Sequence, residues 1–95
     1  MKILAVCGFG VGSSMVLKMT LDKVIKDLGV TGASVENTDI ASAKATDADV
    51  YFTSAELAPD LKESTSKPVY TIKRYMDKNE VGEKLKEYLA EQEEK

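Results

Sequence analysis

Hydrophobic and polar positions along this chain follow two alternating patterns: short apolar runs and longer stretches with helical spacing. The first run is Lys2–Val6, apolar at every position after the lysine, which is typical of a strand buried on both faces of a parallel sheet. Apolar residues then recur every three or four positions and predict one buried face of a helix. These residues are Leu17, Leu21, Val24, Ile25 and Leu28. Gly29 follows at the position where helices commonly end.

The rest of the chain continues this alternation of strands and helices. Further strands are predicted at Ala33–Thr38, Asp49–Thr53 and Pro68–Ile72. Helical structure is expected at Asp39–Thr46, in one turn near Asp60–Glu63, and over Asp77–Glu91. The last helix should bury an apolar stripe made of Val81, Leu85, Tyr88 and Leu89.

Strands that alternate with helices need crossover connections, so the pattern predicts one small parallel α/β sheet. With the first strand in an interior position, the expected sheet is four-stranded and Rossmann-like, with order 2-1-3-4 and helices on its flanks. Ninety-five residues suit a single domain that covers residues 1–95. Ligands of such sheets bind beyond the carboxyl ends of the strands, at the point where the strand order reverses. The segment directly after Val6 is expected at that point.

That segment reads Cys7-Gly8-Phe9-Gly10-Val11-Gly12-Ser13-Ser14. A buried strand delivers a thiol, a loop with three glycines follows, and a helix begins, with Ser13 or Ser14 as its expected cap. Glycines permit positive φ and a close approach of the main chain, so consecutive N–H groups can surround a phosphate at the positive end of the helix dipole. The same potential favours the thiolate, the nucleophilic form of cysteine. We therefore expect phosphoryl chemistry on Cys7, with residues 8–14 binding the phosphate.

Other interpretations of this loop fit the residues less well. A free cysteine is often only a small buried hydrophobe, but Cys7 stands at a strand end beside glycines. A dinucleotide site would read G-x-G-x-x-G/A where this chain has Ser13, although Glu36 or Asp39 could serve as its acidic residue. A receiver domain would carry an aspartate where the third strand ends in Thr53, and a thioredoxin-like site needs a second cysteine.

The tyrosine-phosphatase loop, C-x-x-x-x-x-R-[ST], is the nearest mechanistic parallel. Cys7 and Ser14 fit this frame, but Ser13 occupies the position of the arginine that clamps the phosphate. Hydrolysis would also need an activated water, and neither a histidine nor a carboxylate is present in the loop. These residues favour a loop that holds phosphate on sulfur for another acceptor rather than losing it to water.

Composition narrows the possible functions. The net charge of −3 disfavours bulk attraction to nucleic acid or to an anionic membrane. One cysteine fits a reducing cytosol, and the absence of histidine removes most zinc geometries and a phosphate-carrying imidazole. No run approaches the ~18 apolar residues of a membrane span. We expect a cytoplasmic protein with no metal site, no cofactor, no nucleic-acid partner and no insertion into the membrane.

The stretch Ile3-Leu4-Ala5-Val6-Cys7-Gly8-Phe9-Gly10-Val11-Gly12-Ser13-Ser14-Met15, with the following Lys18-Met19, resembles a known family. It is similar to the IIB components of the bacterial phosphoenolpyruvate-dependent sugar phosphotransferase system (PTS), in the lactose/cellobiose-type superfamily. Within that superfamily it looks most like the ascorbate-type branch. Galactitol-type and cellobiose-type relatives share the cysteine loop, so the sugar stays open.

This resemblance implies a phosphoryl-transfer enzyme. A phosphohistidine on the IIA protein would donate phosphate to Cys7, and Cys7 would pass it to a sugar bound by the membrane transporter IIC. The absence of histidine agrees, because this chain cannot itself be the phosphohistidine member. Two alternatives stay open at this point: a non-enzymatic regulatory module that binds a phosphoanion, and a small phosphatase.

Partner docking is expected at the same edge of the sheet. The loops after the first, third and fourth strands should surround Cys7, and they contain Phe9 and Val11, then Ser54–Pro59, then Lys73–Tyr75. Phe9 and Val11 lie in a loop that should be exposed, where apolar side chains have no core to fill. Lys73 and Arg74 follow the fourth strand and form a basic pair on a net-acidic protein. Phe9 packed onto the first helix, and Lys73 and Arg74 as solvated strand-end charges, are the alternative interpretations.

Overall fold

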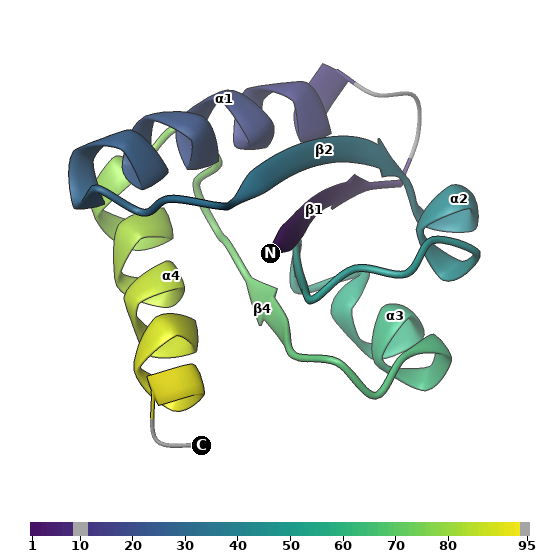
Figure 1. Cartoon of the computed structure of the whole chain (residues 1–95). Helices are drawn as coiled ribbons and strands as arrows, with labels where there is room; N and C mark the ends of the chain where they lie inside the picture. The colour runs from purple at the N-terminus through teal and green to yellow at the C-terminus, as the bar shows by residue number, and fades with distance from the viewer. Residues whose placement is uncertain (9–11, 94–95) are drawn as a thin grey trace.

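In this computed structural model the described residues are 1–8 and 12–93. Over these residues the chain alternates four strands with four helices, as Figure 1 shows. In order they are β1 (Lys2–Cys7), α1 (Gly12–Leu28), β2 (Ser34–Asp39), α2 (Ile40–Lys44), β3 (Val50–Thr53), α3 (Ala58–Ser64), β4 (Val69–Thr71) and α4 (Lys78–Glu93). The predicted alternation of elements is confirmed.

The strands form one parallel sheet with the order β2-β1-β3-β4, as predicted. Cys7 pairs with Asp39 at the carboxyl ends of β1 and β2, and Thr53 pairs with Thr71 at those of β3 and β4. Because all strands run the same way, these four residues mark one edge of the sheet. The loops that leave this edge are the ones able to form a site around Cys7.

The core lies in two layers, one on each face of the sheet. Alternate residues of β1 point to opposite faces, so Ile3 and Ala5 pack in a different apolar cluster from Leu4 and Val6. The larger cluster lies under α1 and α4, and the smaller lies under α2 and α3 (Figure 1). With both faces covered, β1 reads as a continuous apolar run in the sequence.

Several predicted helical positions are confirmed and others are wrong. Leu17, Leu21 and Val24 are buried, whereas Ile25 is only partly buried and Leu28 is 37% exposed. Leu28 lies in the last turn of α1, where it lines a depression between α1 and α4. In α4, the stripe Val81, Leu85 and Tyr88 is buried and Leu89 is partly buried.

The ends of the helices explain the remaining differences. Ser13 and Ser14 were expected to cap α1, but α1 begins at Gly12, so both serines lie inside its first turn. The single turn predicted near Asp60 is the longer helix α3, because Pro59 suits a first helical turn, where a missing N–H costs nothing. The predicted end of α1 is confirmed, since Gly29 has φ of +70° and Val30 N–H donates to the Ile25 carbonyl.

Candidate active site at the end of β1

Cys7 is the last residue of β1 and is buried, with 4% of its surface exposed. Its thiol donates to the hydroxyl oxygen of Ser14, with the sulfur 3.2 Å from Oγ, and lies 3.7 Å from the Thr38 carbonyl oxygen. Ser14 is fully buried in the first turn of α1. The end of the strand and the start of the helix are thus joined across the loop by side chains at its two ends.

Two further hydrogen bonds fix this edge of the sheet. The Asn37 amide on β2 donates to the same Ser14 oxygen at 3.4 Å. The buried Thr53 hydroxyl on β3 donates to the Val6 carbonyl at 3.0 Å. The position of the sulfur therefore depends on β1, β2, β3 and α1 together, and a site held by rigid elements needs little rearrangement to act.

Cys7 lies at one side of a groove of about 340 Å³. The residues that line it are Cys7, Gly8, Ser13, Ser54, Glu56, Leu57 and Tyr75. They come from the segments that follow β1, β3 and β4, which is the arrangement expected at the carboxyl edge of a parallel sheet. A groove of this size has room for a phosphoryl group and part of a second molecule.

Tyr75 was expected near Cys7 only as part of the loop after the fourth strand, with no role of its own, and its side chain lines the groove. Burial raises the pKa of its phenol above the ordinary value; a hydrogen bond with Ser54 opposes this, and the charges of Cys7 and Glu56 add to it. Tyr75 is therefore protonated at neutral pH and can donate a hydrogen bond. The signal in the sequence was its position just after the fourth strand, which alone does not separate it from its neighbours.

Glu56 is a second residue to which the sequence analysis gave no role, although its loop was expected near Cys7. The loop after β1 has no carboxylate, but the loop after β3 brings Glu56 to the groove as an exposed side chain. Leu57, beside it, is the nearest neighbour of Gly8, because a Cβ built on Gly8 would meet its side chain at 3.8 Å. Gly8 does not use the positive φ that glycine permits, unlike Gly29 and Gly32.

Of the predicted phosphate-binding residues, the structure brings Gly8, Ser13 and Ser14 next to Cys7. Gly12 opens α1. Phe9, Gly10 and Val11 lie outside the described residues. The predicted contacts of those three with phosphate or with a partner stay predictions.

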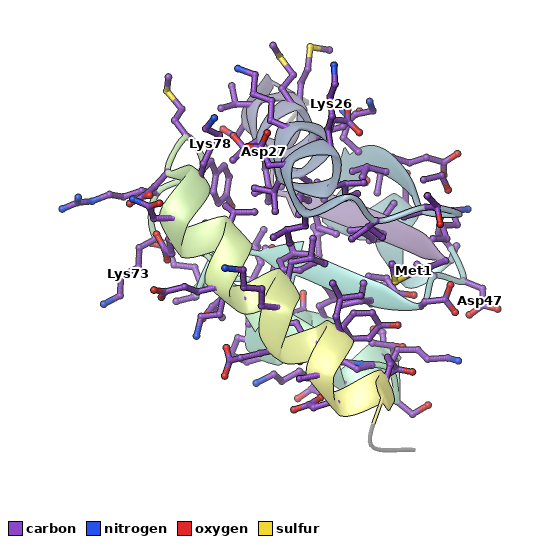
Figure 2. The ribbon with its side chains drawn as sticks, turned by 60° about the vertical axis from the view of Figure 1, so that its left-hand side comes forward. Met1, Lys26, Asp27, Asp47, Lys73 and Lys78 are labelled. Atoms are coloured by element: carbon purple, nitrogen blue, oxygen red, sulfur yellow. The ribbon has the colours of Figure 1, made fainter. Side chains whose placement is uncertain are left out.

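Lys73 and Arg74 are exposed and are not among the residues that line the groove. Their backbone N–H groups donate to the Glu80 carboxylate at 2.6 and 2.9 Å, which ties the end of the β4 segment to the first turn of α4. The side chain of Lys73 points away from the body of the protein (Figure 2). No ion pair within 4 Å involves either residue over residues 1–8 and 12–93.

The described part of the chain contains no group of three or more His, Cys, Asp or Glu side chains placed to hold a metal ion. It also contains no helix that is long and apolar enough to cross a membrane.

Comparison with known proteins finds similarity over almost the whole chain. Residues 2–87 match the family described as "PTS system, Lactose/Cellobiose specific IIB subunit". An ascorbate-specific PTS system EIIB component from Mycoplasma pneumoniae is 31% identical over 91 residues, covering 94% of this chain and 95% of that protein. Proteins of the same description from Salmonella typhimurium and Escherichia coli O157:H7 are each 29% identical over 92 residues, covering 95% of this chain and 90% of theirs.

Proposed function

Because the chain belongs to the lactose/cellobiose-type IIB family of the PTS, we propose that it is a phosphoryl carrier with Cys7 as the covalent site. Phosphohistidine on a IIA protein donates the phosphoryl group, and a sugar bound by the membrane transporter IIC receives it, on the cytoplasmic side. The single observation that carries this proposal is the position of the Cys7 sulfur, which lies at the end of β1 beside a groove and bonds to the first turn of α1.

The first step exchanges one bond for another. The Cys7 sulfur attacks phosphorus, the S–P bond forms, and the P–N bond to the donor imidazole breaks. The sulfur loses its proton and the departing imidazole nitrogen takes one up, so no net proton is released. In the second step a sugar hydroxyl oxygen attacks phosphorus, the S–P bond breaks, and the sulfur recovers a proton.

The start of α1 supplies positive potential to this chemistry. The helix is 17 residues long, and the positive end of its dipole favours an anion near the first turn. Ser13, in that turn, lines the groove. A dianionic phosphoryl group on Cys7 would lie in this field, which stabilises it without an arginine.

Tyr75 extends this stabilisation to the far side of the groove. Its protonated phenol is placed with Cys7 and Ser13 around the same space, so it can donate to a phosphoryl oxygen. Glu56 acts in the opposite sense, since a carboxylate near the dianion raises the free energy of the phosphorylated state. A phosphorylated state that is not too stable suits a carrier, because a carrier must pass its phosphate on.

We further propose ascorbate as the sugar, since the relatives at about 30% identity carry that specificity in their names. The test is transfer from phosphorylated IIA, through this protein, to labelled ascorbate in vesicles that contain the ascorbate IIC. Galactitol and cellobiose, each with its own IIC, are the matched alternatives. Labelled product with ascorbate alone supports the assignment; product with another sugar moves the protein to that branch.

A regulatory module that binds a phosphoanion non-covalently is the second candidate. The open groove and the helix N-terminus would serve that function too. The two candidates differ in the fate of phosphate. A carrier holds one phosphate per chain through denaturation until acid or iodine removes it, whereas a binding module releases it on unfolding.

A further inference from the structure

Beside the Cys7 groove, the surface carries apolar side chains that the core does not use. Met15, Val16 and Met19 project from the first two turns of α1, and Met76 lies just before α4. Their exposed fractions are 50%, 37%, 54% and 80%, so water covers much of their apolar surface. We call these four residues the methionine patch. Clustered exposed apolar side chains mark interaction surfaces, and methionine adapts its shape to a partner.

The methionine patch is hollowed rather than flat. A depression of about 250 Å³ is lined by Val16, Met19, Thr20, Lys23, Met76 and Lys78, and its walls are mostly apolar. Two segments that are far apart in the sequence build it, the outer face of α1 and the turn before α4. A depression of this kind can receive an apolar side chain of a partner.

The methionine patch is also close in the chain to residues that line the groove at Cys7. Ser13 and Tyr75 line that groove, while Met15 and Met76 are their near neighbours in the chain. Ser14, which lies between Ser13 and Met15, bonds to the Cys7 sulfur at 3.2 Å. A protein seated on the patch would therefore reach Cys7 from the side of α1 and the α4 turn.

The rim of the methionine patch is basic. Lys23 and Lys78 line its depression, and the exposed Lys73 and Arg74 precede Met76. The Nζ atom of Lys78 lies 3.6 Å from Oδ2 of Asp27, and Figure 2 shows the two residues beside each other. Both side chains are more than half exposed. In the described part of the chain, Lys23 makes no ion pair within 4 Å. On a protein of net charge −3, the two lysines that line the depression fit an acidic rim on the partner.

We propose that the methionine patch is the docking surface for the phosphorylated donor protein, through an apolar centre and an acidic rim on that protein; this rests on the function proposed above. The direction of transfer favours the donor over the transporter. Before transfer the negative phosphoryl group lies on the donor, and the basic rim attracts it. After transfer the dianion lies on Cys7 and offsets the rim, so the donor is released.

Two other occupants fit less well. A second copy of the chain would bring the same basic rim against itself, with like charges opposed across the interface. An anionic membrane surface would attract these lysines but repel the rest of a net-acidic chain. Both are separate outcomes of the test.

The test measures binding of purified phosphorylated IIA to Cys7→Ser protein, in which no transfer can follow. The double variant Met19→Ser, Met76→Ser should bind about tenfold more weakly, because truncating the apolar centre of an interface costs the most affinity. Leu28→Ser is the matched control, since Leu28 is 37% exposed on the same helix α1 but at its opposite end. It should leave the dissociation constant within about twofold of the parent value.

Unchanged affinity in the double variant would overturn the proposal. The proposal is also overturned if the double variant binds phosphorylated IIA normally but loses binding to IIC vesicles, to protein-free anionic vesicles, or to a second copy of the chain. Phosphorylation of otherwise unaltered protein with Cys7 present separates this proposal from the proposed function. If the parent protein never takes up phosphate, the function fails; if the parent and the double variant take it up at equal rates, only the docking surface fails.

Discussion

The Cys7 sulfur lies 3.2 Å from the Ser14 hydroxyl oxygen, so a strand end and a helix start share one buried hydrogen bond. That oxygen also accepts from the Asn37 amide. Ser14→Ala removes the acceptor that these two donors share and should lower the free energy of unfolding by about 1–2 kcal/mol. Because the sulfur loses its contact with α1, phosphorylation of Cys7 by phosphorylated IIA should also slow by about tenfold.

Denaturant unfolding and a labelling time course measure these two effects. Thr46→Ala is a suitable control, since it also removes a hydroxyl hydrogen bond, at 2.8 Å, but on the exposed end of α2. A Ser14→Ala protein that labels at the parental rate would contradict the role given to this bond.

Tyr75→Phe removes one hydroxyl from the groove at Cys7 and leaves the ring in place. If the protonated phenol donates to the phosphoryl group, the rate of Cys7 phosphorylation should fall by about three- to thirtyfold. Tyr70→Phe is the matched control, because the Tyr70 hydroxyl bonds to Glu91 at 3.2 Å, away from the groove. Equal rates in the Tyr75 and Tyr70 variants would remove Tyr75 from the chemistry.

Lys73 and Arg74 stay predicted docking residues. Both side chains are exposed, and because Glu80 holds their backbone N–H groups, alanine at each position keeps that contact. The Lys73→Ala, Arg74→Ala double variant should exchange phosphate with IIA several-fold more slowly at low salt. The difference should shrink near physiological salt, where exposed charges are screened over ~8–10 Å. Exchange that is slowed equally at all salt concentrations would contradict electrostatic steering.

Tyrosine titration predicts how the fold responds to alkali. Burial, followed by the hydrogen bond to Glu91 and the charges of Glu91 and Glu87, raises the pKa of Tyr70 from 10.0 to about 12. A raised folded-state pKa means stabilisation that is complete below pH 10 and is lost as the pH rises toward 12. The free energy of unfolding of the parent protein should therefore fall relative to Tyr70→Phe across that interval. A constant difference from pH 8 to 12 would contradict the shift.

Sequence patterns were enough to predict the sheet and the place of Cys7. The continuous run Ile3–Val6 is typical of a strand covered on both faces, and the glycine loop after it favours a turn at the sheet edge. Parallel strands bring their carboxyl ends together, so the loops after β1, β3 and β4 were expected around Cys7, and they line its groove. The predicted strand order depended on placing the first strand in the interior of the sheet, and β1 lies between β2 and β3.

The features that the sequence patterns did not predict depend on how segments far apart in the chain lie relative to one another. Helical spacing predicted that Leu28 is buried, but spacing says nothing of where the sheet beneath α1 ends. The capping prediction for Ser14 was wrong because the helix starts earlier and the thiol uses its hydroxyl. Tyr75 and Met76 are neighbours in sequence that line different depressions, which only the path of the chain after β4 decides.

The central claim is that Cys7 carries the phosphoryl group, and mass spectrometry of the intact protein tests it most directly. After incubation with phosphorylated IIA at neutral pH, the parent protein should gain the mass of one phosphoryl group, with the fragment that contains Cys7 carrying it. Cys7→Ser should fold, because serine fits the volume of cysteine, and should gain nothing. Phosphate on any other residue, or a Cys7→Ser protein that labels like the parent, would contradict the account.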